Sequence, residues 1–413
     1  MYIFGKYVAL PTIVLSVICL VLLIAVIVVL VLYLQANGRV TTVGNSSTVT
    51  GQVVPSRYSN KNAISGFQAN RNSTLWRMVF VGDFGFAQVN SNTGGTIAYE
   101  CNVPFLVSNL IENSQSIGQY VVTQNLFGYD AALKDPRVTM TGDWSGASTT
   151  TGYGIGGRYF STTSSTATLV FRPSQMLKNN VQFYALASSA RFSISATSNG
   201  AAVTVTPSTI TPIPSTNIVE YSYSLNNVAW YPVLTITATG ATSTTPVTLF
   251  GWAQKNDFRS IVNTSLVTAT SANIAASVSP TSWLNGGLQV LRPNLMVIQN
   301  PISDYTSGIP IEQSAENIKP LLDRCQALSI PVIAVTPPWV GFVSADTQQT
   351  FTDTFKAMYA KYSNVMVYDF QADMVSFDTQ VSLNLSNTVY TSNYLTPLGG
   401  LRMAQGIYNA LTQ

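Results

Sequence analysis

An almost unbroken apolar run near the amino terminus most constrains what this chain can fold into. It extends from Val8 to Leu34 and contains no charged residue. About 20 apolar residues suffice to span a bilayer as a helix, whereas the apolar core of a secretory signal has only about 7–15. The run therefore predicts one retained transmembrane helix over residues 8–34, after a short tail over residues 1–7. Because Lys6 and the α-amino group precede it, we expect the tail inside and the body of the chain outside.

The composition excludes several classes of site. Charged residues make up only 9% of the chain, so Ser, Thr, Asn, Gln and Tyr must cover much of the surface. No acidic residue precedes Asp83, but the basic residues before it are scattered, which favours a solvated linker over a nucleic-acid site. The chain has 3 cysteines and no histidine, so we expect neither a disulfide framework nor a zinc site of the usual ligands. No glycine pattern of a nucleotide-binding loop is present, and we expect no cofactor.

Changes in residue type divide the rest of the chain into three parts. Residues 35–74 are rich in Gly, Asn, Ser and Thr without a helical period, which predicts a stalk or linker. Residues 149–254 contain short runs rich in Val, Thr, Ile, Phe and Tyr between turn residues, which predict a β-sandwich. Residues 75–148 and 255–413 contain buried strands and amphipathic helices, as in LMVIQ and IEQSAENIKPLLDRCQALS. Alternating strands and helices predict a parallel sheet with helices on both faces.

Four short motifs in the α/β part resemble blocks of the SGNH (GDSL-like) hydrolase family. VFVGDFG resembles the first block, which usually ends Gly-Asp-Ser, and NLMVIQNPISDY resembles the third, which usually ends Gly-x-Asn-Asp. SIPVIAVTPPW and TSNYLTPLGGLRMA resemble the strand that follows and the last block, which normally carries Asp-x-x-His. The resemblance covers roughly residues 75–90 and 250–413. It implies an SGNH-like three-layer α/β fold, interrupted by the β-sandwich and preceded by one transmembrane helix.

The same resemblance places unreactive residues at the catalytic positions. Phe84 stands at the nucleophile position, Thr391 at the aspartate position and Tyr394 at the histidine position. In such enzymes a serine attacks the ester, a histidine takes its proton and an aspartate orients the histidine. Because the chain has no histidine at all, the resemblance predicts a protein without this catalysis, and hence not an enzyme.

Three residues of these blocks are expected to line what remains of the cleft. Asp83 and Asp304 match the family's blocks, and Ser303 stands where the oxyanion-hole asparagine normally lies. We expect both carboxyl groups to hold loops in place by accepting N–H hydrogen bonds. The alternative is that they act as a carboxylate pair, which can hydrolyse glycosides.

Aromatic residues of the predicted sandwich are the candidate ligand-binding residues. Trp230, Tyr231 and Trp252 have rings that could stack on sugars, although such side chains more commonly pack in a core.

These observations lead to a hypothesis of a non-enzymatic, membrane-anchored structural or surface protein, such as a virion component, built on an SGNH scaffold. It would contact the bilayer through residues 8–34 and other structural proteins or surface glycans elsewhere. The alternatives are a glycan-binding attachment protein and a carbohydrate hydrolase with a non-triad mechanism. No metal and no specific nucleic-acid partner is expected, and the oligomeric state is left open.

Overall fold

The protein is represented by a computed structural model of the 413-residue chain. It describes residues 2–3, 6–7, 57–72, 75–83, 86, 102–114, 121–125, 138–146, 159–172, 180–189, 191–226, 232–254, 259–265, 270–275, 279–374, 376–382 and 395–412. The chain divides into two compact units, Met1–Pro55 and Ser56–Gln413. In the first unit, β1 (Tyr2–Ile3) pairs antiparallel with β2 (Lys6–Tyr7). The predicted transmembrane segment, residues 8–34, lies outside these ranges, and within them no helix is long and apolar enough to cross a membrane.

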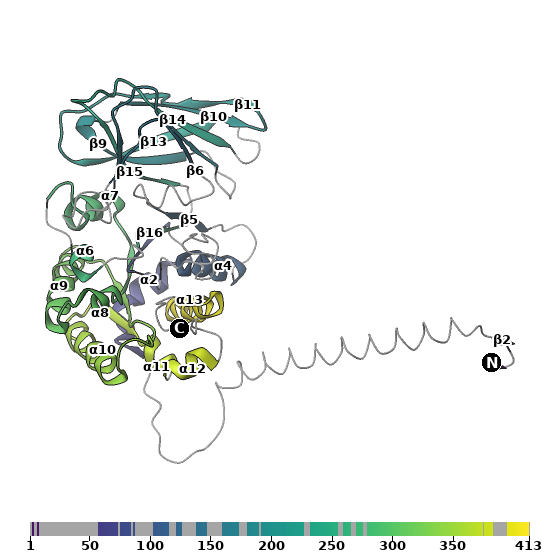
Figure 1. The fold of residues 1–413 in the computed structure, drawn as a ribbon, viewed down its shortest axis with the longest axis vertical. Coiled ribbons are helices and arrows are strands. Elements are labelled where there is room, and N and C mark those ends of the chain that lie inside the picture. The colour runs from purple at the N-terminus through teal and green to yellow at the C-terminus, as the bar shows by residue number, and fades with distance from the viewer. Residues whose placement is uncertain are drawn as a thin grey trace, which may run out of the picture. The chain divides into compact units, whose positions relative to one another are not determined.

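The second unit contains a seven-stranded sheet with helices on both faces (Figure 1). The strand order is β3–β19–β18–β17–β4–β16–β5, and all neighbours are parallel except β3, which is antiparallel to β19. The strands are β3 (Tyr58–Ser59), β4 (Arg77–Val81), β5 (Val121–Asn125), β16 (Arg259–Asn263), β17 (Leu295–Gln299), β18 (Val332–Val335) and β19 (Val365–Tyr368). The predicted α/β part with a parallel sheet is confirmed, and an antiparallel edge strand is added to it from residues expected to be stalk.

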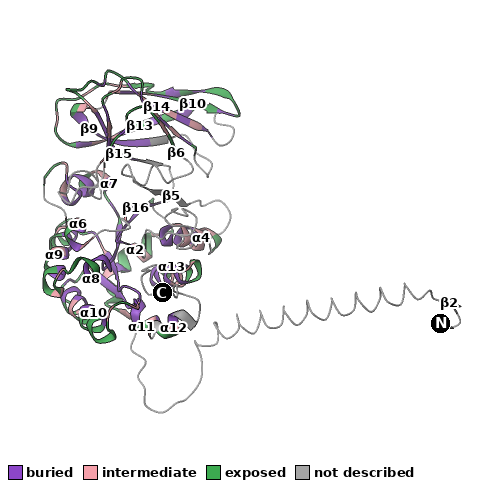
Figure 2. Ribbon diagram, in the orientation of Figure 1, coloured by how far each residue is buried: buried purple, intermediate pink, exposed green. Residues whose placement is uncertain are grey.

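Continuous apolar runs explain why the central strands are buried on both faces. In β17 all residues are buried, as they are in β16 (Figure 2). Successive side chains of a strand point to opposite faces, so each strand feeds two separate cores. Val79 of β4 lies in one core, whereas Met78 and Phe80 lie in the other.

Two layers of helices cover the two cores. One layer contains α6 (Ser271–Ile274), η6 (Trp283–Gly287), α7 (Leu288–Leu291), α9 (Ile311–Ala327) and α10 (Ala345–Tyr359). The other contains η1 (Lys61–Ile64), α2 (Ser65–Asn70), α4 (Val103–Ser114), α11 (Phe370–Met374) and α13 (Pro397–Thr412). α13 packs against α4 (Figure 1) and begins with proline, whose missing N–H is not needed in the first helical turn.

The β-rich part is one antiparallel sheet of ten strands. Its order is β6–β8–β14–β10–β11–β13–β9–β15–β7, with β12 paired to β10. The strands are β6 (Val138–Thr141), β7 (Phe160–Thr162), β8 (Thr168–Phe171), β9 (Asn180–Leu186), β10 (Phe192–Ser198), β11 (Ala201–Thr206), β12 (Thr209–Ile210), β13 (Ile218–Asn226), β14 (Val233–Ala238) and β15 (Val247–Gln254). The sequence predicted two separate sheets; instead, β11 pairs with both β10 and β13 and joins the two halves around one core.

The β-rich part adjoins the seven-stranded sheet at the amino-terminal ends of its parallel strands. Arg77, the first residue of β4, forms an ion pair with Glu220 of β13. Tyr184 of β9 and Ile218 of β13 are buried in the same core as α7. The carboxyl-terminal ends of the parallel strands, where open α/β sheets usually bind ligands, point away from the β-rich part.

Candidate active site

Asp83 lies directly beyond the carboxyl-terminal end of β4. Val81 is paired with Ile298 of β17, so the register brings the next residues of β17, Gln299 and Asn300, alongside Gly82 and Asp83. Gly82 permits this close approach: a Cβ atom there would lie 3.0 Å from the Gln299 Cβ. The parallel sheet thus brings one carboxyl group and two amides together at the carboxyl-terminal ends of β4 and β17, where open α/β sheets usually bind ligands.

Ser303 holds one oxygen of the Asp83 carboxyl group. Its backbone N–H donates to Asp83 Oδ2 at 2.9 Å and its hydroxyl to the same oxygen at 3.3 Å. Ser303 begins the short helix α8 (Ser303–Ser307), so the turn after β17 presents both donors together.

Burial dominates the electrostatics of Asp83. The side chain has no exposed surface, and desolvation raises its pKa to about 7, although hydrogen bonds from the backbone of Ser303 and Ile302 act in the opposite direction. The nearby charge of Asp304 adds a smaller upward effect on the same pKa. A carboxyl group with a pKa near neutrality can both accept and donate a proton at physiological pH.

Several buried polar atoms around Asp83 lack partners within the described part of the chain. They are Asp83 Oδ1, both amide atoms of Gln299 and Nδ2 of Asn300. The other side-chain atom of Asn300, Oδ1, accepts a hydrogen bond from the Tyr359 hydroxyl. Buried polar groups without partners are costly and concentrate at functional sites, so this cluster is the strongest candidate for an active site.

Asp304 is in a different situation. Its Oδ1 accepts a hydrogen bond from the backbone N–H of Ser271 at 2.8 Å, and its Oδ2 accepts one from the hydroxyl of Ser314. Burial raises its pKa as well. Both oxygens are thus used to connect α6, α8 and α9, as expected for a carboxyl group that holds loops in place.

The remaining predicted site residues lie outside what the structure describes. This applies to Phe84, Thr391 and Tyr394 at the positions of the triad, and to Trp230 and Tyr231. Trp252 belongs to β15, but its side chain is not among those described. Their roles stay predictions.

Gln299 and Asn300 were not predicted as site residues. The available signal was the polar end of an otherwise apolar strand, LMVIQ followed by Asn300. Glutamine is mostly an exposed residue type, so a buried glutamine at the carboxyl-terminal end of a central strand indicates a candidate site residue.

Comparison with known proteins identifies the fold. No family profile and no curated protein sequence matches the chain. A solved structure of a peptidoglycan O-acetylesterase matches with a TM-score of 0.58 at 11% identity, covering 87% of this chain and 96% of that chain. An esterase from Pseudoalteromonas matches with 0.30 at 15% identity, covering 37% of this chain and 76% of that chain. A GDSL-like lipase from Bacteroides thetaiotaomicron matches with 0.29 at 17% identity, covering 37% of this chain and 75% of that chain.

The chain therefore has the fold of this peptidoglycan O-acetylesterase. This supports the SGNH-like α/β fold that the sequence motifs imply. The transmembrane helix that was predicted with it lies outside the described residues. The comparisons give no support to a virion or other structural role.

The prediction that the chain is not an enzyme is contradicted, because the solved structure whose fold it shares over most of the chain is that of an esterase. The prediction rested on the replaced residues at the three catalytic positions and on the absence of histidine. That absence excludes a histidine base, but not hydrolysis. Burial raises the pKa of the Asp83 carboxyl group to about 7, close to the ordinary pKa of histidine.

Proposed function

We propose that this chain is a carbohydrate ester hydrolase that works without histidine, with Asp83 as the group that transfers the proton. The observation that carries the proposal is the buried Asp83 carboxyl group: its pKa is about 7, and one of its oxygens accepts no hydrogen bond from a described residue. General bases are most effective when their pKa lies near the working pH.

The proposed reaction has two proton transfers. The ionised Asp83 takes a proton from a water molecule while the water oxygen attacks the acyl carbon. When the tetrahedral intermediate collapses, the bond between the acyl carbon and the sugar oxygen breaks. The protonated carboxyl group gives its proton to this oxygen, so that the sugar leaves with a free hydroxyl group and the carboxylic acid is released. Because Asp83 is fully buried, substrate binding must be accompanied by local opening of the segments that cover it.

The neighbouring amides supply the second requirement of ester hydrolysis. Gln299 Nε2 and Asn300 Nδ2 are buried N–H donors without partners among the described residues. Fixed donors of this kind stabilise the negative charge that develops on the acyl oxygen, and losing one such donor typically costs about 10²–10³ in rate.

The hydrogen bonds of the second carboxyl group, that of Asp304, favour ester cleavage over glycosidic cleavage as the reaction. A glycosidase needs two carboxyl groups that act on either side of the bond. Both oxygens of Asp304 already accept hydrogen bonds, from Ser271 and Ser314, which supports a single-carboxyl mechanism centred on Asp83.

A carbohydrate ester is the proposed substrate because most of this chain matches the structure of a peptidoglycan O-acetylesterase. We further propose that residues 8–34 anchor the chain in a membrane, which places the hydrolase next to surface glycans.

Purified full-length chain in detergent should release acetate from acetylated xylan and cleave p-nitrophenyl acetate, and it should not cleave p-nitrophenyl glycosides. Asp83→Asn should abolish the activity because the amide cannot take a proton. Asp353→Asn, on the exposed side of α10, is the matched control and should retain full activity. Absence of turnover by folded protein, or equal turnover by Asp83→Asn, would refute the proposal.

A further inference from the structure

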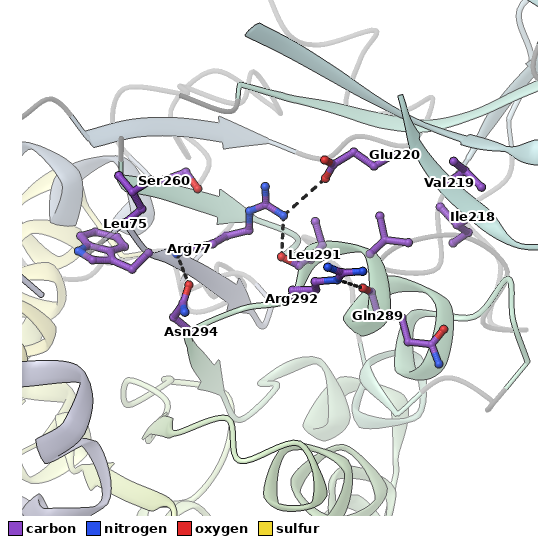
Figure 3. Close-up of a pocket in the computed structure, with 12 residues that line it drawn as sticks. Leu75, Arg77, Ile218, Val219, Glu220, Ser260, Gln289, Leu291, Arg292 and Asn294 are labelled. Atoms are coloured by element: carbon purple, nitrogen blue, oxygen red, sulfur yellow. Dashed lines mark hydrogen bonds and ion pairs between the residues drawn. The ribbon is translucent and has the colours of Figure 1, made fainter. Parts of the chain in front are cut away.

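A groove lies at the amino-terminal ends of the parallel strands, between the seven-stranded sheet and β13 (Figure 3). Its volume is about 580 Å³, within the range of about 300–1,000 Å³ that is usual for ligand sites. Arg77 lines it from the start of β4, whereas Asp83 lies beyond the other end of that strand. At about 3.3 Å per residue, these two residues are roughly 20 Å apart, so the groove is separate from the proposed active site.

One side of the groove carries a fixed ion pair. The Arg77 guanidinium donates to the carbonyl oxygen of Leu291 at 2.6 Å and lies 3.8 Å from Glu220 Oε2. The same oxygen of Glu220 accepts a hydrogen bond from the hydroxyl of Tyr184, a fully buried residue, at 3.1 Å. The negative charge of Glu220 is thus balanced, and the contacts that fix the pair come from four elements, β4, β9, β13 and α7.

Arg292 adds a second guanidinium, which forms no ion pair with an acidic residue in the described part of the chain. Figure 3 shows it beside Leu291, as Arg77 is. Its Nε donates to the carbonyl oxygen of Gln289 at 3.2 Å, and its terminal nitrogens make no other hydrogen bond to a residue that the structure describes. Arg292 is exposed and ends α7 with φ 45°, in the left-handed region where glycine or asparagine is usual. An arginine at such a position keeps a charged side chain at the groove.

The rest of the lining mixes amide and hydroxyl groups with aliphatic side chains. Gln289, Asn294 and Ser260 provide the polar groups, and Leu75 and Val290 the aliphatic ones. A sugar ring offers the matching surface, since it presents hydroxyl groups at its edge and C–H groups on its faces.

We infer that this groove binds a saccharide that bears carboxylate groups, with Arg292 as the principal contact to the carboxylate. A guanidinium group matches the planar geometry of a carboxylate and can bind it through two parallel hydrogen bonds. Binding here does not require the proposed hydrolysis, because the groove and Asp83 lie at opposite ends of β4.

The test is isothermal titration calorimetry of the full-length chain in detergent with trigalacturonate as the probe. Its methyl ester, which has the same rings without the charges, should bind at least tenfold more weakly. Arg292→Gln should weaken trigalacturonate binding about tenfold, whereas Glu220→Gln should leave it unchanged or strengthen it, because a negative charge is removed. Arg172→Gln, an exposed substitution after β8, and Asp83→Asn should both bind as the unaltered chain does.

Four outcomes would overturn the inference. They are absence of trigalacturonate binding by the folded protein, equal binding of the ester, unchanged binding by Arg292→Gln, and equally effective competition by the same concentration of inorganic phosphate. Gln289→Ala serves as a second groove variant and should weaken binding of both the acid and the ester. Because Asp83→Asn is among the controls, loss of hydrolysis and loss of binding can be told apart.

Discussion

Ser303 donates two hydrogen bonds, from its backbone N–H and from its hydroxyl, to one oxygen of Asp83, at 2.9 and 3.3 Å. The other oxygen of this carboxyl group accepts no hydrogen bond from a described residue. Two donors on a carboxylate would normally lower its pKa, yet the pKa of Asp83 is raised to about 7 because burial outweighs them.

The first prediction concerns the pH dependence of hydrolysis. If ionised Asp83 is the base, kcat/KM should rise with pH and level off above about 7. Ser303→Ala removes the hydroxyl donor that favours the ionised form, so the pKa of Asp83 should rise and the midpoint of the profile should move to higher pH. Ser303→Thr keeps a hydroxyl and should leave the midpoint near its original value. A midpoint that is the same in all three proteins would argue against Asp83 as the titrating group.

The second prediction concerns stability, which can be measured without any substrate. The pKa of Asp83 is about 7 in the folded chain, against an ordinary value of 3.8. Between pH 3.8 and about 7, the folded chain therefore keeps a proton on Asp83 that the unfolded chain has released. The stabilising contribution of the protonated carboxyl group is therefore complete below about pH 4 and is lost as pH rises through about 7. Asp83→Asn stays neutral, so at pH 8 it should be more stable than the unaltered chain, by an amount on the order of a few kcal/mol.

Urea denaturation at pH 5 and pH 8 measures this difference. At pH 5 the two proteins should differ much less, because Asp83 is then largely protonated. A difference that is the same at both pH values would mean that the buried carboxyl group does not titrate near neutrality. Asp353→Asn, whose carboxyl group is exposed, should show no such pH-dependent gain.

The third prediction separates stability from activity at Gln299. Its amide oxygen and nitrogen are both buried without a partner among the described residues, at a cost of roughly 1–3 kcal/mol for each such group. Gln299→Met has a similar volume and no polar atoms, so it should raise the urea midpoint. The same substitution should lower kcat if the amide stabilises the acyl oxygen. A variant that is less stable and fully active would show that the amide has a structural partner and no role in the reaction.

The fourth prediction tests the proposed anchor. Arginine at the centre of a membrane helix costs about 2.5–3.5 kcal/mol, so Leu22→Arg combined with Ile27→Arg should move the expressed chain out of the membrane fraction. Thr42→Arg combined with Gln52→Arg adds the same charge outside the apolar run and should leave the chain in that fraction after alkaline carbonate washing. If both double variants behave alike, residues 8–34 are not the anchor.

Much of the α/β fold could be predicted from residue patterns alone. The helix expected over IEQSAENIKPLLDRCQALS is α9 (Ile311–Ala327), and the apolar run LMVIQ is β17. These elements are long or strongly apolar, and their pattern is local. β3 could not be predicted, because a strand as short as Tyr58–Ser59 exists only through its pairing with Tyr368 and Val367, about 300 residues later.

The candidate site was predictable only in part, for a similar reason. The motifs pointed to Asp83, Ser303 and Asp304, but no pattern indicates that Ser303, 220 positions after Asp83, donates to its carboxyl group. The different use of the two aspartates depends on Ser314 and Ser271, which reach Asp304 from α9 and α6. Such differences arise from the packing of distant segments.

The fifth prediction uses two glycines in helices of the same layer. A Cβ atom on Gly406 of α13 would lie 2.0 Å from the hydroxyl oxygen of Tyr368, a buried side chain that stacks on Tyr58 at 5.3 Å. Because the ring cannot easily move, Gly406→Ala should force α13 away from the sheet and destabilise the chain by about 1–3 kcal/mol or more. A Cβ atom on Gly66 of α2 would meet nothing within 4 Å, so Gly66→Ala should instead stabilise the chain by roughly 0.5–1 kcal/mol through helix propensity. Urea denaturation of both variants checks the pair, and a Gly406→Ala variant as stable as Gly66→Ala would show that α13 does not pack this closely on β19.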